Sequence, residues 1–124
     1  MAPAGQRDLS SVHLTRHARD RFVERFGGDP DPDVAEVSLR AALGRTRRLG
    51  RNARNGAIAF LALHEGQVLV AIVQEATCLT VLTWPQFEPH LSEFGRPRLP
   101  RKWGRTLRRL VDPPDEADGS TDST

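Results

Sequence analysis

Three side chains at four-residue intervals, His17, Arg21 and Arg25, are the part of this sequence best suited to chemistry. On a helix, this spacing places side chains on successive turns of one flank. A ribonuclease that works without a metal needs a base for the 2′-hydroxyl, an acid for the leaving oxygen and cations for the phosphate. The spacing therefore predicts a catalytic site in which His17 is the base and the two arginines hold the phosphate.

The acid of such a site is not identified by the sequence, because Glu24 and His64 are both candidates. Thr80 and Thr83 lie at the end of a predicted strand and could hydrogen-bond a substrate if they face the same surface. Threonine is also a good strand residue, so neither threonine needs a functional explanation.

Each member of the predicted catalytic site also has a simpler interpretation. His17 could be a solvated histidine in the first turn of a helix. Arg21 and Arg25 could pair with Asp20, Glu24 or Asp33, as surface arginines of helices commonly pair with carboxylates.

The helix that must carry these side chains is predicted over residues 15–26. Thr15 is a suitable N-cap, and Gly27 followed by Gly28 ends the helix. An apolar stripe recurs every four residues along it and consists of Leu14, Ala18, Phe22 and Phe26. This stripe indicates that one side of the helix faces a hydrophobic core.

A second helix is predicted from Pro32 to Leu43, since Asp31 and Pro32 form a typical helix start; a continuation to Leu49 stays open. Residues 10–14 alternate polar and apolar residues, as a short edge strand does. Three strand-like apolar runs follow the helices, joined by short links, at residues 57–63, 68–73 and 77–84.

These elements predict an α+β fold: a short N-terminal strand, two helices on one side of the sheet, then a three-stranded antiparallel meander. Around this core, composition divides the chain into four parts. We interpret them as a flexible leader (1–9), an α+β core domain (10–84), a basic proline-containing extension (85–111) and an acidic disordered tail (112–124).

Charge is distributed unevenly along the 124 residues, although the formal net charge is only +2. Residues 112–124 contain five acids and no base, so the rest of the chain has 18 basic against 11 acidic residues. A body rich in arginine favours a polyanionic partner, because guanidinium groups pair with phosphate and stack on bases. The alternative is that the arginine content reflects a GC-rich genome.

Two basic segments are the predicted nucleic-acid contacts. The first is the connection 45–54, with Arg45, Arg47, Arg48, Arg51 and Arg54. The second lies in the C-terminal extension, with Arg101, Lys102, Trp103 and Arg105. Like charges in one connection repel each other, so we favour contact with nucleic acid over a merely solvated loop.

The remaining composition excludes several classes. Cys78 is the only cysteine, so neither an internal disulfide nor a multi-cysteine metal site is expected, and its apolar neighbours suggest a buried strand position. No apolar run is long enough for a membrane span or resembles a signal peptide, which predicts a cytoplasmic protein. We expect neither a cofactor nor a metal ion.

The segment Leu-Thr-x-His-Ala-x-x-Arg, together with the element order of residues 10–84, resembles the RelE/ParE-like toxin fold. The residues that match are Thr15, His17, Ala18 and Arg21. The resemblance implies a small toxin that cuts RNA without a metal or acts on a protein target, with an antitoxin as its partner.

Two functions are therefore predicted. The first is a metal-independent endoribonuclease of RelE-like toxin type that acts on RNA. The alternative is a small non-catalytic regulator, of the kind that phages encode, that binds nucleic acid or a host protein. Catalysis requires His17, Arg21 and a sheet residue to meet in one pocket, whereas binding requires only a continuous basic surface.

Overall fold

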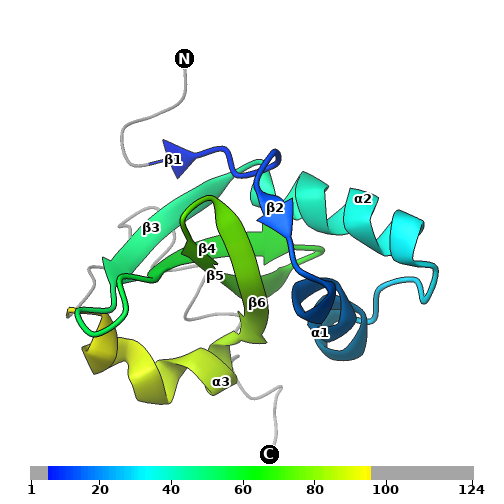
Figure 1. The fold of residues 1–124 in the computed structure, drawn as a ribbon. Helices are drawn as coiled ribbons and strands as arrows, with labels where there is room; N and C mark the ends of the chain where they lie inside the picture. Colours follow the sequence, from blue (N-terminus) through cyan, green and yellow to red (C-terminus); the bar gives the residue numbers. More distant parts are fainter. Residues whose placement is uncertain (1–5, 96–124) are drawn as a thin grey trace, which may run out of the picture.

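The computed structural model describes residues 6–95, which form a central mixed sheet with helices on both faces (Figure 1). The sheet has six strands in the order β1-β3-β4-β5-β6-β2. The strands are β1 (Gln6–Arg7), β2 (His13–Leu14), β3 (Thr46–Arg51), β4 (Ile58–His64), β5 (Gln67–Gln74) and β6 (Thr77–Thr83). All neighbours are antiparallel except β2 and β6, which are parallel. The predicted α+β class is confirmed.

Two helices cover one face of the sheet, as expected, and begin at the predicted caps: α1 (Arg16–Phe26) and α2 (Pro32–Leu43). The Thr15 hydroxyl accepts a hydrogen bond of 3.0 Å from the Ala18 amide, and Gly27 closes α1 with φ 67°. Asp31 caps α2 by accepting from the Asp33 amide at 2.9 Å.

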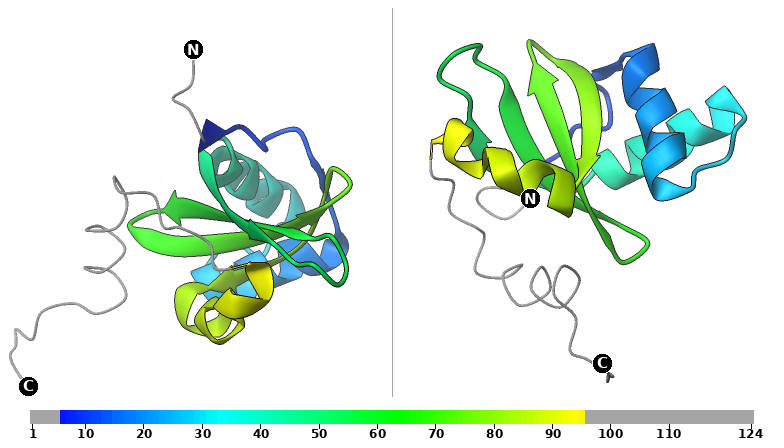
Figure 2. Two further views of the ribbon diagram at one scale, coloured as in Figure 1. Left: turned by 90° about the vertical axis from the view of Figure 1, so that its left-hand side faces the viewer. Right: turned by 90° about the horizontal axis from the view of Figure 1, so that it is seen from below.

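The opposite face is covered by α3 (Trp84–Phe87) and the 3₁₀ helix η1 (Glu88–Phe94), as Figure 2 shows. Residues 85–94 therefore do not form the irregular segment that their prolines suggested. Thr83 and Gln86 build a capping box at the start of α3, and Pro85 occupies its first turn, where proline is tolerated.

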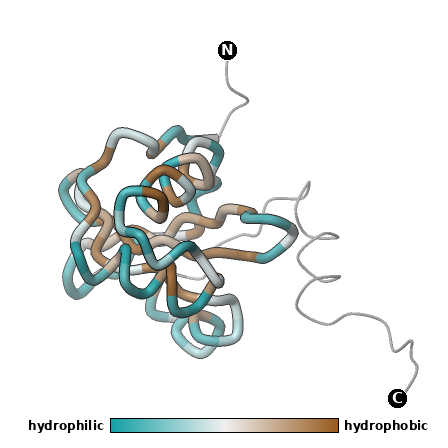
Figure 3. The backbone as a smooth tube through the Cα atoms, turned by 90° about the vertical axis from the view of Figure 1, so that its right-hand side faces the viewer, coloured by the Kyte–Doolittle hydropathy of each residue, from teal (hydrophilic) through white to brown (hydrophobic). Residues whose placement is uncertain are grey.

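Two hydrophobic clusters fix this layered arrangement because residues alternate along the strands. In β4, Phe60 and Ala62 belong to the cluster beneath α1 and α2, whereas Ala59 and Leu61 belong to the cluster beneath α3 and η1. Figure 3 shows hydrophobic segments of the strands inside the molecule and hydrophilic segments around them.

The segment expected to be an arginine loop is mainly a strand, which corrects the sequence prediction. Residues 46–51 form β3 and pair antiparallel with β4, with a bulge between Arg48 and Gly50. Leu49 therefore does not extend α2, which ends at Leu43; it packs instead in the cluster beneath α3 and η1. The sheet is thus larger than the predicted three-stranded meander.

The predicted leader also contributes to the sheet, since Gln6 and Arg7 of β1 pair with β3. From there the chain reaches the other edge of the sheet, where β2 lies beside β6. The predicted edge strand at residues 10–14 is thus confirmed in a shorter form. None of the helices within residues 6–95 is both long and apolar enough to cross a membrane.

Candidate functional site

His17 lies in the first turn of α1 with its side chain exposed. Its imidazole makes no hydrogen bond or ion pair within residues 6–95. Arg21 and Arg25 follow on the same helix but are already engaged. Arg21 Nη1 lies 2.6 Å from Glu24 Oε2, and Arg25 Nη1 donates to the Val81 carbonyl at 2.8 Å. The predicted phosphate ligands thus have partners within the protein.

The two candidates for the acid, Glu24 and His64, contact other residues and not His17. Glu24 is held by Arg21, as described above. The His64 side chain is only 13% exposed and packs against the Phe22 and Phe26 rings, with centroid distances of 5.0 and 6.4 Å. His64 therefore lies beneath the second half of α1, while His17 lies at its exposed start.

Thr80 and Thr83 of β6 do not offer their hydroxyl groups to a substrate from one surface either. Thr83 is the N-cap of α3: its amide donates to Gln86 Oε1 at 2.9 Å, and its hydroxyl accepts from the Gln86 amide at 3.4 Å. The Thr80 hydroxyl is buried and has no hydrogen-bond partner among the described residues. The structure thus does not assemble the predicted catalytic residues in one pocket.

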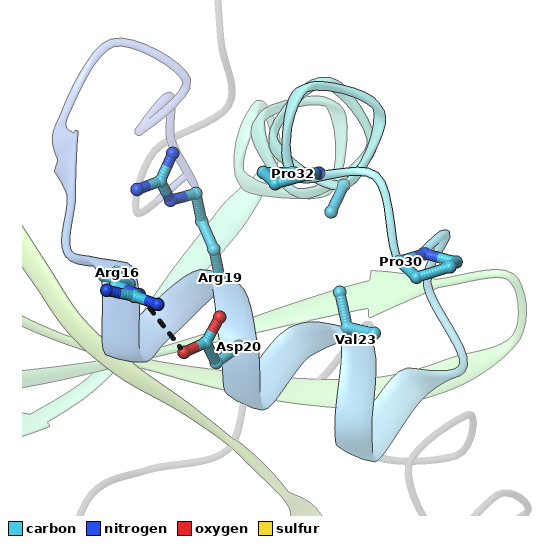
Figure 4. Close-up of a pocket in the computed structure, with 7 residues that line it drawn as sticks. Arg16, Arg19, Asp20, Val23, Pro30 and Pro32 are labelled. Carbon is cyan, nitrogen blue, oxygen red and sulfur yellow. Dashed lines mark ion pairs between the residues drawn. The ribbon is translucent and has the colours of Figure 1, made fainter.

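A pocket of about 260 Å³ lies on the other flank of α1, between α1 and the start of α2 (Figure 4). Its lining consists of Arg16, Arg19, Asp20, Val23, Pro30, Pro32 and Ala35. None of the predicted site residues belongs to it. The double-proline helix start is the sequence signal that could have drawn attention to this region.

Charged side chains beside this pocket link α1, α2 and the N-terminal segment. Glu36 accepts hydrogen bonds from Arg40 Nε at 3.0 Å and from Arg19 Nη1 at 3.2 Å, and the bond from Arg40 lowers the pKa of Glu36. Arg40 also donates to the carbonyls of Ser10 and Val12, each at 2.8 Å. These arginines therefore hold α1, α2 and the N-terminal segment together.

A different group of arginines is free of such partners and gathers around β3. We define the β3 arginine surface by its four exposed members: Arg45, Arg48, Arg51 and Arg54. No ion pair or side-chain hydrogen bond within residues 6–95 involves their guanidinium groups. The chain has no aspartate or glutamate between Gly44 and His64, so no acid near in sequence offsets their charge.

Pairing between β3 and β4 sets the direction of two of these side chains. Arg48 is paired with Phe60 and Arg51 with Ile58, and directly opposed residues project to the same face of a sheet. Phe60 and Ile58 contribute to the cluster beneath α1 and α2. Arg48 and Arg51 therefore share the face that these helices cover, and both stay exposed there. Arg47 is half-buried and has an interaction within the protein.

The loop after β3 is held in a defined shape. The Asn52 side chain accepts from the Arg54 amide at 2.9 Å, and the Asn52 amide donates to the Ala57 carbonyl at 2.8 Å. The Arg51 guanidinium lies over Gly56, since a Cβ atom there would be 3.3 Å from Arg51 Nη2. The local hydrogen bonds thus keep Arg51 and Arg54 on one short, ordered segment.

The other expected contacts, Arg101, Lys102, Trp103 and Arg105, lie outside the described residues, as does the acidic tail. Within residues 6–95, no group of three or more histidine, cysteine or acidic side chains is placed to hold a metal ion. Cys78 is buried, as predicted, and this burial raises the pKa of its thiol to about 12.

Comparison with protein-family models, with curated proteins and with solved structures finds no match to this chain. The resemblance to RelE/ParE-like toxins stays a prediction.

Proposed function

We propose that this protein is a non-catalytic nucleic-acid-binding protein that holds RNA through the β3 arginine surface. One observation carries the proposal: Arg45, Arg48, Arg51 and Arg54 are exposed and unpaired within the described part of the chain. Exposed cations without acidic partners are available to phosphate, and neutralising phosphates releases counterions, which favours binding.

The arginines of α1 provide the contrast that supports this choice of surface. Arg16, Arg19 and Arg21 each have a carboxylate within 4.0 Å, and Arg25 donates to a main-chain carbonyl. Binding of phosphate by α1 would have to displace these partners, whereas binding at the β3 arginine surface displaces no side-chain partner of its four arginines within residues 6–95.

Single-stranded and duplex RNA oligonucleotides, with DNA of the same sequence, test the proposal in a fluorescence anisotropy titration at several salt concentrations. The Arg48→Gln/Arg51→Gln variant should bind RNA more weakly and lower the salt slope of log Kd by about 2, since each lost phosphate contact removes about one unit. The matched control is Arg16→Gln/Arg21→Gln, which removes the same charge from α1 and should retain most of the wild-type affinity.

Equal weakening by both double variants would mean that only overall charge matters and would overturn the assignment to β3. No salt-dependent binding by the wild-type protein would overturn the proposal altogether.

The endoribonuclease prediction is tested on the same samples, in excess EDTA. RNA cleavage that leaves 2′,3′-cyclic phosphate ends and is lost in His17→Ala would replace the binding proposal by a toxin-type enzyme. Intact RNA in both proteins is the outcome that the non-catalytic proposal expects.

A further inference from the structure

The outward side of α2 carries an apolar stripe that no described element covers. Ala35, Leu39, Ala42 and Leu43 face the core, whereas Val34 and Val37 are 44% and 70% exposed and Ala41 is also exposed. The spacing of Val34, Val37 and Ala41 places them along one line of the helix. Figure 2 shows α2 at the periphery of the helical layer.

The two ends of this stripe have opposite charge. Asp29, Asp31 and Asp33 are all exposed at the start of α2, and Arg45 is exposed just beyond its end. Arg40 does not contribute to the outward side, because its guanidinium is turned to Glu36 and to two carbonyls of the N-terminal segment.

We propose that this face of α2 binds α2 of a second copy of this chain in antiparallel orientation. A register with Val34 opposite Ala41 places Val37 at the centre of the pair. The same register places Arg45 opposite Pro30, between Asp29 and Asp31 of the other copy. A twofold axis repeats every contact, so each apolar stripe is covered and each acidic end meets a basic end.

The proposed contact is small. A 12-residue helix is about 18 Å long, so one helix pair buries less area than a standard stable interface. The dimer is therefore weak, depends on protein concentration and weakens as salt screens the end charges. This inference does not depend on nucleic-acid binding, and it uses a different variant set.

Sedimentation velocity of the full chain over a wide concentration range, at low and at high salt, tests the proposal. The wild-type protein should shift from monomer to dimer as concentration rises, and Val37→Lys should stay monomeric. The control is Ser92→Lys, which adds the same charge at an exposed position of η1 and should dimerise as the wild type does. A wild-type chain that stays monomeric throughout would overturn the proposal.

A charge exchange then tests the antiparallel register. Asp29→Arg and Arg45→Asp should each weaken self-association, because each brings like charges together at both ends of the pair. An equimolar mixture should restore the dimer, since a mixed pair has opposite charges at both ends. Dimers that persist in both single variants, or a mixture that stays monomeric, would contradict this register. Arg45 also belongs to the β3 arginine surface, so these measurements of self-association are made without RNA, and the Arg48 and Arg51 variants test RNA binding separately.

Discussion

The Arg25 guanidinium donates a 2.8 Å hydrogen bond to the main-chain carbonyl of Val81 in β6. β2 pairs only with Thr77 and Cys78, so no strand within residues 6–95 pairs with the outer edge of β6 from residue 79 onward. Thr15 donates from its hydroxyl to the Leu79 carbonyl at 3.0 Å, further along the same edge. α1 thus uses two side chains to satisfy a sheet edge.

Arg25→Ala should lower the free energy of unfolding by about 1–2 kcal/mol, because it leaves a half-buried carbonyl without its charged donor. Arg21→Ala removes an exposed pair with Glu24 and should change it by less than about 0.5 kcal/mol. Urea denaturation of the two variants measures the difference. Equal effects would show that the bond to Val81 contributes no more than a surface ion pair.

Gly50→Ala should destabilise the fold by roughly 2–3 kcal/mol through overpacking. A Cβ atom at position 50 would lie 2.0 Å from the Phe94 carbonyl oxygen, so η1 must move away from β3. Gly44→Ala is the matched control, since Gly44 has a right-handed conformation, with φ −65°, and a nearest Cβ contact of 3.3 Å. Thermal unfolding of both variants checks the prediction, and a wild-type Tm in Gly50→Ala would refute it.

Ala76→Gly should stabilise the β5–β6 hairpin by about 0.5–1 kcal/mol. Glu75 and Ala76 have φ values of 50° and 63°, as a two-residue turn with both central residues left-handed requires, and glycine adopts this conformation without strain. The same change at Ala53, in a loop without positive φ at that position, should not stabilise. A higher urea midpoint for Ala76→Gly alone is the expected result.

Cys78 should resist thiol reagents in the folded protein. The reactive form is the thiolate, and burial raises the pKa of Cys78 to about 12, so at pH 8 the folded thiol stays protonated. Reaction with a disulfide reagent should therefore follow unfolding and speed up in urea. Fast reaction of the native protein at pH 8 would contradict the burial of this thiol.

The same pKa shift has a defined sign for stability. An unfolded thiol ionises near pH 8.5, whereas the folded thiol stays neutral up to about pH 12. The contribution of Cys78 to the free energy of unfolding is therefore complete below about pH 8.5 and decreases as pH rises toward 12. Cys78→Ser should reduce this decrease when urea midpoints are compared at neutral and alkaline pH.

The helices could be predicted from sequence because their signals are local. Thr15, Asp31 and Gly27 are cap residues within a few positions of the groups that they satisfy. β3 could not be predicted, because it takes up six of the ten residues from Arg45 to Arg54, and five of these ten are arginines. Its strand conformation depends on pairing with β4, which is a tertiary effect.

For the candidate site, sequence spacing predicted which side chains share a flank of α1 but not what each contacts. Arg25 bonds to a residue 56 positions away, and His64 packs beneath α1 against Phe22 and Phe26. Such contacts follow from the docking of α1 on the sheet, which the periodicity of one helix cannot specify. The five arginines of residues 45–54 are a candidate contact from composition alone, whereas the strand that carries Arg47, Arg48 and Arg51 depends on pairing with β4.

The short length of β1 has a further consequence for handling this protein. β1 pairs only with Thr46 and Arg47, so no described strand pairs with the outer edge of β3 beyond them. Open edges invite strand-to-strand aggregation, and like charges at Arg48 and Arg51 on every copy oppose it. Replacements of Arg48 and Arg51 should thus be polar, because an apolar side chain at either position would make this edge strand prone to aggregation.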